Sequence, residues 1–143
     1  MGLAPAAQPP QGRKGEVGLT LVLDSAALIA LERNERAMWT RMKAAENDGG
    51  QPVTHAGVVG QVWRGGPRQA RLSHALDGID VRVVDEPLGR AAGVLLGRTG
   101  LSDVIDAAVV LISSDGDDIV TLDRDDLQRL AAALGRHVEL IRP

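Results

Sequence analysis

The sequence predicts an α/β domain, a three-layer α/β/α sandwich in which helices cover both faces of a central, mostly parallel sheet. Two observations carry this prediction. Short apolar runs of strand length alternate along the chain with longer segments of helical character, which is the order that connects parallel strands through helices. The first run, residues 19–23 (LTLVL), carries no charged residue. Such a run is typical of a strand buried on both faces of a sheet.

The expected strands are short aliphatic runs bounded by turn residues. They are residues 19–23, 52–54, 81–84, 119–122 and 138–141. The expected helices fill the intervals, and their ends follow from capping and helix-breaking residues. The first four are residues 25–32, 35–47 (before Asp48-Gly49-Gly50), 55–64 (capped by Thr54 and stopped by Gly65-Gly66-Pro67) and 68–76. The last three are residues 87–98 (Pro87 in the first turn), a helix capped by Ser102 that runs to about Ser113, and 123–134, ended by Gly135.

The domain is expected to span residues 19–143, since a chain of 143 residues is long enough for one core. Residues 1–18 are rich in Pro, Gly and Gln and are interpreted as a disordered leader, or as a consequence of the choice of start site. They contain no apolar stretch of the signal-peptide kind, and the longest apolar run, residues 107–112, is too short to cross a bilayer. We therefore expect a soluble, cytoplasmic protein that binds no membrane.

The composition excludes several classes of function. Without cysteine the chain has no disulfides, thiolate zinc sites or thiol nucleophiles. With two Trp and no Phe or Tyr, it lacks the aromatic platforms on which many RNA-binding modules stack bases. A net charge of −3 does not describe a general nucleic-acid binder. It remains compatible with a nuclease in which a local basic rim surrounds an acidic pocket.

Two aspartates directly follow predicted strands. Asp24 closes the run 19–23, and Asp123 follows the run 119–122. In an open α/β sheet, ligands gather outside the carboxyl ends of the strands, so both side chains are expected to face such a crevice. The alternative is structural: aspartate is a favoured N-cap, and each of these two precedes a helix. Asp126, three residues after Asp123, would complete a capping pair.

Two further aspartates open the Ala/Val-rich helix. Asp103 and Asp106 are three apart and share one face, and Asp103 could simply complement the positive end of the helix dipole. Asp106 is flanked by apolar residues, with no Lys or Arg within four positions. Because burying a lone carboxylate is costly, we favour a functional role for Asp106. Converging carboxylates select a hard cation such as Mg²⁺ or Mn²⁺, whose matching chemistry is hydrolysis of a phosphodiester.

Four segments together resemble the PIN-domain ribonucleases of the VapC toxin family, from type II toxin–antitoxin systems. They are VLDSAALIALE from Val22, VTHAGVVGQVWRGG from Val53, GLSDVIDAAVVLI from Gly100 and DDIVTLDRDDLQRL from Asp117. They occur in the family's order and spacing, and the resemblance covers about residue 19 to the C-terminus. It implies a PIN-like fold and a metal-dependent endoribonuclease that is the toxin of a pair. It also implies a homodimer in the cytoplasm, held in check by a small antitoxin.

The resemblance also assigns roles to individual residues. Asp24, Asp106 and Asp123 correspond to the family's ligands for one or two Mg²⁺ or Mn²⁺ ions, and Asp103 is an extra carboxylate close to the same site. Three residues would support them: Ser25, Thr121 and Asp126. The departure is Gln61, which stands where the family usually has a glutamate. Asp103 could compensate for the lost charge; the alternative is a catalytically weak or inactive PIN domain that binds RNA or a protein.

Other polar residues have weaker patterns. A basic rim for phosphates could be built from Arg33, Arg64, Arg68, Arg71 and Arg124, although each alone is better explained as part of a solvated helix face. The three histidines, His55, His74 and His137, lack metal-ligand spacing and are expected on the surface or in caps. Two other acidic-pocket classes fit less well. A haloacid-dehalogenase-type phosphatase needs D-x-D after the first strand, and a phosphoryl-transfer receiver needs a late lysine, absent here beyond Lys43.

Overall fold

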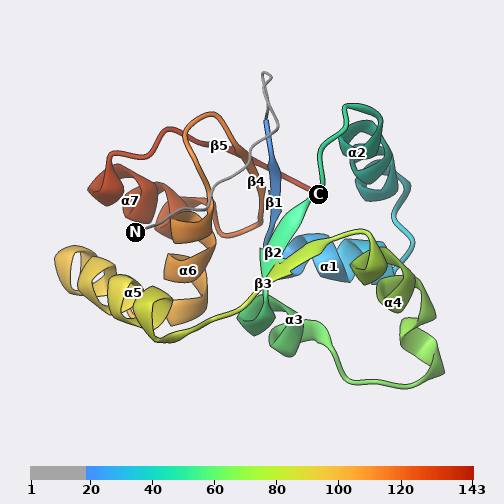
Figure 1. Cartoon of the computed structure of the whole chain (residues 1–143), viewed down its shortest axis with the longest axis horizontal. Coiled ribbons are helices and arrows are strands. Elements are labelled where there is room, and N and C mark those ends of the chain that lie inside the picture. The colour runs from blue at the N-terminus through green and yellow to red at the C-terminus, as the bar shows by residue number, and fades with distance from the viewer. Residues whose placement is uncertain (1–18) are drawn as a thin grey trace, which may run out of the picture.

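Five parallel strands form the centre of the structure, a computed structural model that describes residues 19–143 (Figure 1). The strands are β1 (Leu21–Leu23), β2 (Val53–His55), β3 (Asp80–Arg82), β4 (Asp118–Val120) and β5 (Glu139–Ile141). They lie in the order β3-β2-β1-β4-β5, and each neighbouring pair is parallel. The predicted α/β class with a parallel sheet is confirmed. The leader predicted at residues 1–18 lies outside the described residues.

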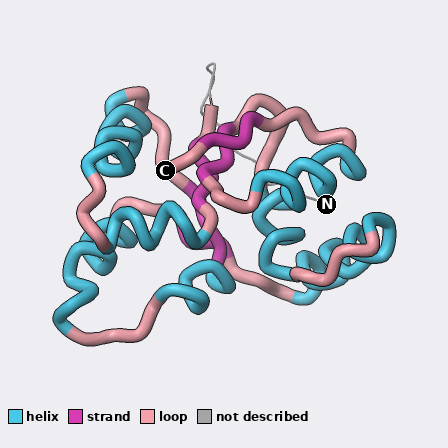
Figure 2. The backbone as a smooth tube through the Cα atoms, turned by 180° about the vertical axis from the view of Figure 1, so that it is seen from behind, coloured by secondary structure: helices cyan, strands magenta, loops and turns pink. Residues whose placement is uncertain are grey.

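Helices cover both faces of this sheet. They are α1 (Ser25–Glu32), α2 (Arg36–Asn47), α3 (Ala56–Val62), α4 (Ala70–Asp77), α5 (Glu86–Thr99), α6 (Val104–Ile112) and α7 (Arg124–Leu134). α1 to α4 lie on one side of the sheet and α5 to α7 on the other, and the view from behind shows the strands as a narrow band between the two groups (Figures 1 and 2). The arrangement is the predicted α/β/α sandwich. None of the helices within residues 19–143 has the length and apolar character needed to cross a membrane.

The topology places a crevice beside the central strand. From β1 the chain adds β2 and β3 on one side, then returns to add β4 and β5 on the other. Strand order therefore reverses between β1 and β4, which pair along their length from Leu21↔Asp118 to Leu23↔Val120. Because ligands bind at the carboxyl ends of strands where the order reverses, the residues that follow β1 and β4 are the first place to search for a site.

The core that holds these two strands is aliphatic. Val22, Leu23, Ile119 and Val120 have no exposed surface, and they pack between apolar faces of the helices on both sides. Burying each such side chain contributes about 1.5–3 kcal/mol. The carboxyl ends of β1 and β4 are therefore held by fully buried residues of the core.

Two predicted helix caps are wrong by one residue. Thr54 was expected to cap α3, but its hydroxyl is buried and donates to the Leu23 carbonyl oxygen (2.7 Å), while the His55 imidazole accepts from Gly57 N and caps the helix. Ser102 was expected to cap α6, but Asp103 does so, accepting from the N–H groups of Ile105 and Asp106. In both pairs the neighbouring residue reaches the free N–H groups of the first turn, and the expected cap does not.

The element boundaries lie within about two residues of the predicted ones. Helix α1 has the predicted bounds. Helix α7 ends at Leu134, and the capping residue Gly135 has a φ of 67°, the left-handed conformation that favours glycine. Strand β3 begins and ends earlier than residues 81–84, because it pairs in register with β2 from Val53↔Asp80 onward. The segment predicted as helix 68–76 begins with a 3-10 turn at Pro67–Gln69 before α4.

Candidate metal centre

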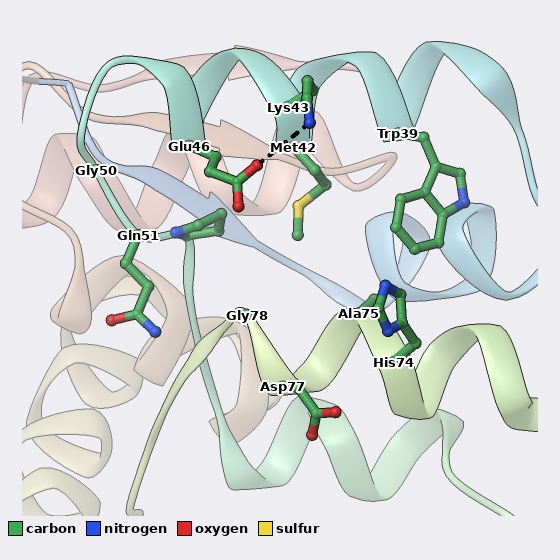
Figure 3. A pocket seen from close by; sticks show the side chains of 11 residues that line it. Trp39, Met42, Lys43, Glu46, Gly50, Gln51, His74, Ala75, Asp77 and Gly78 are labelled. Atoms are coloured by element: carbon green, nitrogen blue, oxygen red, sulfur yellow. Dashed lines mark ion pairs between the residues drawn. The ribbon is translucent and has the colours of Figure 1, made fainter.

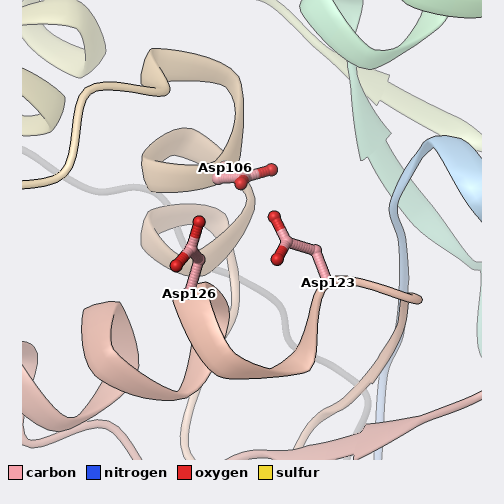
Figure 4. A group of neighbouring side chains, drawn as sticks. All are labelled: Asp106, Asp123 and Asp126. Atoms are coloured by element: carbon pink, nitrogen blue, oxygen red, sulfur yellow. The ribbon is translucent and has the colours of Figure 1, made fainter.

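Three carboxylates converge beside the point where strand order reverses. Asp106 lies in the first turn of α6, Asp123 follows β4 as the N-cap position of α7, and Asp126 lies in the first turn of α7. One oxygen from each lies within 4.8 Å of the others, and Figure 4 shows the side chains pointing toward a common space. Two oxygens bound to one Mg²⁺ at about 2.1 Å lie about 3 Å apart in cis and about 4.2 Å apart in trans. Small side-chain rotations would therefore close this cluster on a cation.

The electrostatics of Asp106 are those of a group that needs a counter-charge. The side chain is only 7% exposed. Burial first of all, then a hydrogen bond with Asp123 and the negative charges of Asp103 and Asp24, raise its pKa to about 8. Without a cation, this raised pKa favours the protonated form of Asp106 at neutral pH. A divalent cation at this position would replace that proton.

Asp24 lies next to the cluster and is held by two donors. Its Oδ1 accepts from Ser25 N (2.8 Å) and its Oδ2 accepts from the Thr121 hydroxyl (2.8 Å). Burial raises the pKa of Asp24; the two hydrogen bonds oppose this effect, and the charges of Asp123 and Asp103 add to it. Asp24 therefore starts α1, as the capping alternative predicts, and its charge also acts on Asp106 in the cluster.

Thr121 connects the two strand ends. Its side chain has no exposed surface; its hydroxyl donates to Asp24 and accepts from Asp123 N (2.9 Å). The predicted supporting role of Thr121 therefore has a geometric basis, because one hydroxyl sets the position of both aspartates. Ser25 contributes its backbone N–H to Asp24.

Asp103 and Gln61 stand apart from the three converging carboxylates. Asp103 uses Oδ1 to cap α6, with distances of 2.9 Å to Ile105 N and 3.1 Å to Asp106 N, so it acts on the cluster through its charge. Gln61 is an exposed residue of α3 that lines a neighbouring hollow together with arginines. Asp126, predicted as supporting, belongs to the cluster itself.

His55 interacts electrostatically with Asp24 and Asp103, whereas the sequence predicted for it only a place on the surface or in a cap. It does cap α3, but it is fully buried. Its Nδ1 accepts from Gly57 N and its Nε2 lies 3.0 Å from the Ile105 carbonyl oxygen, so Nε2 carries the proton and the ring joins α3 to the start of α6. Burial lowers the pKa of His55, which keeps the ring neutral. The available signal was position: His55 ends β2 at the same edge where Asp24 and Asp123 follow their strands.

The surface has one hollow at the carboxylates and a larger one far from them. A hollow of about 540 Å³ reaches the centre through Asp24, Ser25 and Asp123. A larger one of about 620 Å³, between α2 and α4, is lined by Trp39, Met42 and His74 among others (Figure 3). It includes Pro52 and Gly78, which precede β2 and β3, and so it lies at the opposite edge of the sheet from the carboxylates.

The donor set fits a hard divalent cation. The three clustered ligands are all carboxylate oxygens, the type that selects Mg²⁺ or Mn²⁺ over softer metals. The raised pKa of Asp106 indicates that the arrangement is unfavourable when all its carboxylates are ionised and nothing neutralises them. No protein-family model matches the chain, and no curated protein matches it.

Proposed function

We propose that the protein is a Mg²⁺- or Mn²⁺-dependent endoribonuclease of the PIN-domain type, the toxin component of a VapC-like toxin–antitoxin pair. The observation that carries the proposal is the convergence of Asp106, Asp123 and Asp126 at the strand-order reversal, with Asp24 beside them. The resemblance of four sequence segments to that family supplies the substrate class, RNA. It also supplies the expected homodimer, the antitoxin partner and the cytoplasmic location.

Each residue has a defined part in this mechanism. Asp106, Asp123 and Asp126 would hold the cation, and Asp24 would add negative charge from the adjacent strand end. A cation bound there would supply a water of lowered pKa and would neutralise charge on the phosphate in the transition state. Thr121 keeps Asp24 and Asp123 in place. Asp106 would release its proton on cation binding, so rising pH would favour binding.

A second function is favoured by one observation. Gln61 is neutral, exposed and outside the carboxylate cluster. If catalysis requires a further carboxylate at that position, the protein would be a PIN domain that binds RNA or a protein without cutting. In that case wild type would be inactive with any divalent cation, and Gln61→Glu would restore cleavage.

A comparison of substitutions at two adjacent aspartates tests the proposal. Asp125 and Asp126 both lie in the first turn of α7, so both act on the helix dipole, but only Asp126 faces the cluster. We expect Asp126→Asn to lower Mg²⁺ affinity and the rate of RNA cleavage at least tenfold, and Asp125→Asn to leave both within twofold. The readouts are calorimetric titration with Mg²⁺ and cleavage of a labelled single-stranded RNA. Equal effects of the two substitutions would show that Asp126 does not bind the cation.

A further inference from the structure

The hollow that contains Asp24 and Asp123 is called the acidic hollow below. A second hollow beside it, the basic hollow, has the opposite charge. It has a volume of about 350 Å³ and lies between the end of α1 and the segment that joins α3 to α4. Its polar lining residues are Glu32, Arg33, Gln61, Arg64, Arg68 and Gln69. The lining residues therefore include three arginines and one glutamate. Arg124, which was predicted to join a basic rim, lies instead on α7, on the other side of the sheet.

The three arginines are available to a ligand. Within residues 19–143, none of Arg33, Arg64 and Arg68 forms an ion pair with a carboxylate, and all three are exposed. Arg64 donates through Nη1 to the carbonyl oxygens of Gly60 and Trp63, and these two hydrogen bonds orient its guanidinium group. The N–H groups on its other two nitrogens take no part in these bonds. The single carboxylate, Glu32, already accepts from Gln69 Nε2 (2.9 Å). The hollow thus holds excess positive charge without an internal partner.

A buried amide builds the wall that presents these arginines. Gln69 is 5% exposed, and its side-chain amide makes all the hydrogen bonds that its oxygen and its two N–H groups can make. Its Oε1 accepts from Arg64 N (2.7 Å) and Gly65 N (2.9 Å), and its Nε2 donates to Glu32 Oε1 and to the Val62 carbonyl oxygen (2.9 Å each). The connection between α3 and α4 is thereby fastened to α1. Preorganisation of this kind lowers the entropy cost of binding an anion.

The basic hollow lies beside the acidic one. Ile29 and Arg33 line both, and the acidic hollow reaches Asp24 and Asp123. We propose that Arg33, Arg64 and Arg68 bind backbone phosphates of the RNA strand on one side of the phosphodiester to be cut. This inference rests on the proposed function. Guanidinium groups bind phosphate oxygens in a bidentate manner, and such interactions position a strand without reading its bases.

Gln61 gains a role under this proposal. It lies in the basic hollow, where a glutamate would place a second carboxylate beside the three arginines. The neutral amide avoids that repulsion and can donate to a phosphate. Gln61→Glu is therefore expected to weaken RNA binding, and Gln128→Glu, at an exposed position of α7, is the matched control. Restoration of cleavage by Gln61→Glu would contradict this role.

The direct test measures binding with no cleavage. Anisotropy of a labelled single-stranded oligoribonucleotide is recorded in EDTA over a range of salt concentrations, for wild type, the triple variant Arg33→Gln/Arg64→Gln/Arg68→Gln, and the control Arg98→Gln on α5. The slope of log affinity against log salt changes by about 0.7 for each phosphate of a single strand that the protein no longer neutralises. For the triple variant we expect the slope to fall in magnitude by about 2 and the affinity to fall at least tenfold. Unchanged slope and affinity would overturn the proposal, as would equal competition by a polyglutamate peptide, which would indicate a protein ligand.

A second substrate separates this inference from the proposed function. Bis(p-nitrophenyl) phosphate is a diester with a single phosphate group, so it offers no second phosphate for the arginines to bind. With Mn²⁺, the ratio of RNA cleavage to small-diester cleavage should fall at least tenfold in the triple variant and stay constant in Arg98→Gln. An equal ratio in both variants contradicts the inference. If wild type cleaves neither substrate, the proposed function fails, and the binding measurement in EDTA still decides on the phosphate site.

Discussion

Replacing Asp106 by asparagine should change how the stability of the cation-free protein depends on pH. In the folded protein burial, together with the neighbouring aspartates, raises the pKa of Asp106 from 3.8 to about 8. A carboxyl group with a raised pKa binds its proton more tightly in the folded than in the unfolded state. Its contribution to stability is therefore fully present below about pH 4 and is lost as the pH rises to 8.

The magnitude follows from the same shift. Each unit of pKa corresponds to about 1.4 kcal/mol, so the change from 3.8 to about 8 sets a ceiling of about 6 kcal/mol on the stability lost between these pH values. Asparagine at this position has no proton to lose. We therefore expect the free energy of unfolding of Asp106→Asn to exceed that of wild type increasingly as the pH rises, by a few kcal/mol at about pH 8.5.

Urea unfolding in EDTA, followed by circular dichroism between about pH 5 and pH 9, measures this difference. Asp125→Asn is the control, because Asp125 is an exposed residue of the neighbouring α7 and lies outside the cluster. At about pH 8, Mg²⁺ at roughly 100 times its dissociation constant should then stabilise wild type by about 2.7 kcal/mol and leave Asp106→Asn unaffected. Parallel pH profiles for wild type and Asp106→Asn would refute the reasoning.

Two further predictions concern the residues that support the centre. Thr121→Val leaves Asp24 Oδ2 and the Asp123 N–H without their shared partner and should cost about 1–3 kcal/mol in chemical unfolding, with Thr121→Ser close to wild type. Gly57→Ala places a Cβ 2.5 Å from Ile105 Cδ1 and 2.9 Å from the His55 ring, which is fixed at both nitrogens, so it should destabilise by about 1–3 kcal/mol. Gly60→Ala on the same helix meets nothing within 4 Å and should stabilise by about 0.4–1 kcal/mol; the reverse order of these two glycine variants would contradict the packing described.

The order of strands and helices could be predicted because each element has a local signal. Helix α1 begins after Asp24 and has the predicted bounds, because the strand before it and the cap both mark its start. Strand β3 shows the limit of such signals. Val83 and Val84 favour a strand by composition, but they lie beyond the paired residues and are exposed, since the extent of β3 is set by its register with β2. A register between segments distant in sequence has no local signal.

The residues that cap α3 and α6 could not be identified from the sequence for a related reason. At the starts of α3 and α6 two adjacent residues could each supply an acceptor, and Thr54 and Ser102 were the predicted ones. The structure uses His55 and Asp103. Thr54 is occupied by its bond to the Leu23 carbonyl oxygen, which joins two neighbouring strands. At α3 the choice between two possible caps therefore follows from tertiary structure.

The candidate site was predicted in its location and partly in its members. Asp24 and Asp123 were placed by the rule that strand ends face a crevice, and Asp106 by the cost of burying a lone carboxylate. The inclusion of Asp126 depends on the packing of α7 against α6, and the exclusion of Asp103 depends on its use as a cap. Neither the packing nor the cap could be read from the spacing of the aspartates alone.

The basic hollow had even less local signal. Arg33 is separated from Arg64 and Arg68 by about thirty residues of chain. Their grouping depends on Gln69, which joins the end of α1 to the segment after α3 through its hydrogen bonds to Glu32 and Arg64 N. An arrangement of this kind comes from tertiary structure alone.

The central claim is that a divalent cation held by these carboxylates cuts RNA. It is tested most directly by incubating a labelled single-stranded RNA with purified wild type and Asp106→Asn, each with Mn²⁺ and each with EDTA. We expect cleavage by wild type with Mn²⁺ and no cleavage in the other three reactions. Cleavage by wild type in EDTA, or equal cleavage by Asp106→Asn with Mn²⁺, would contradict the claim.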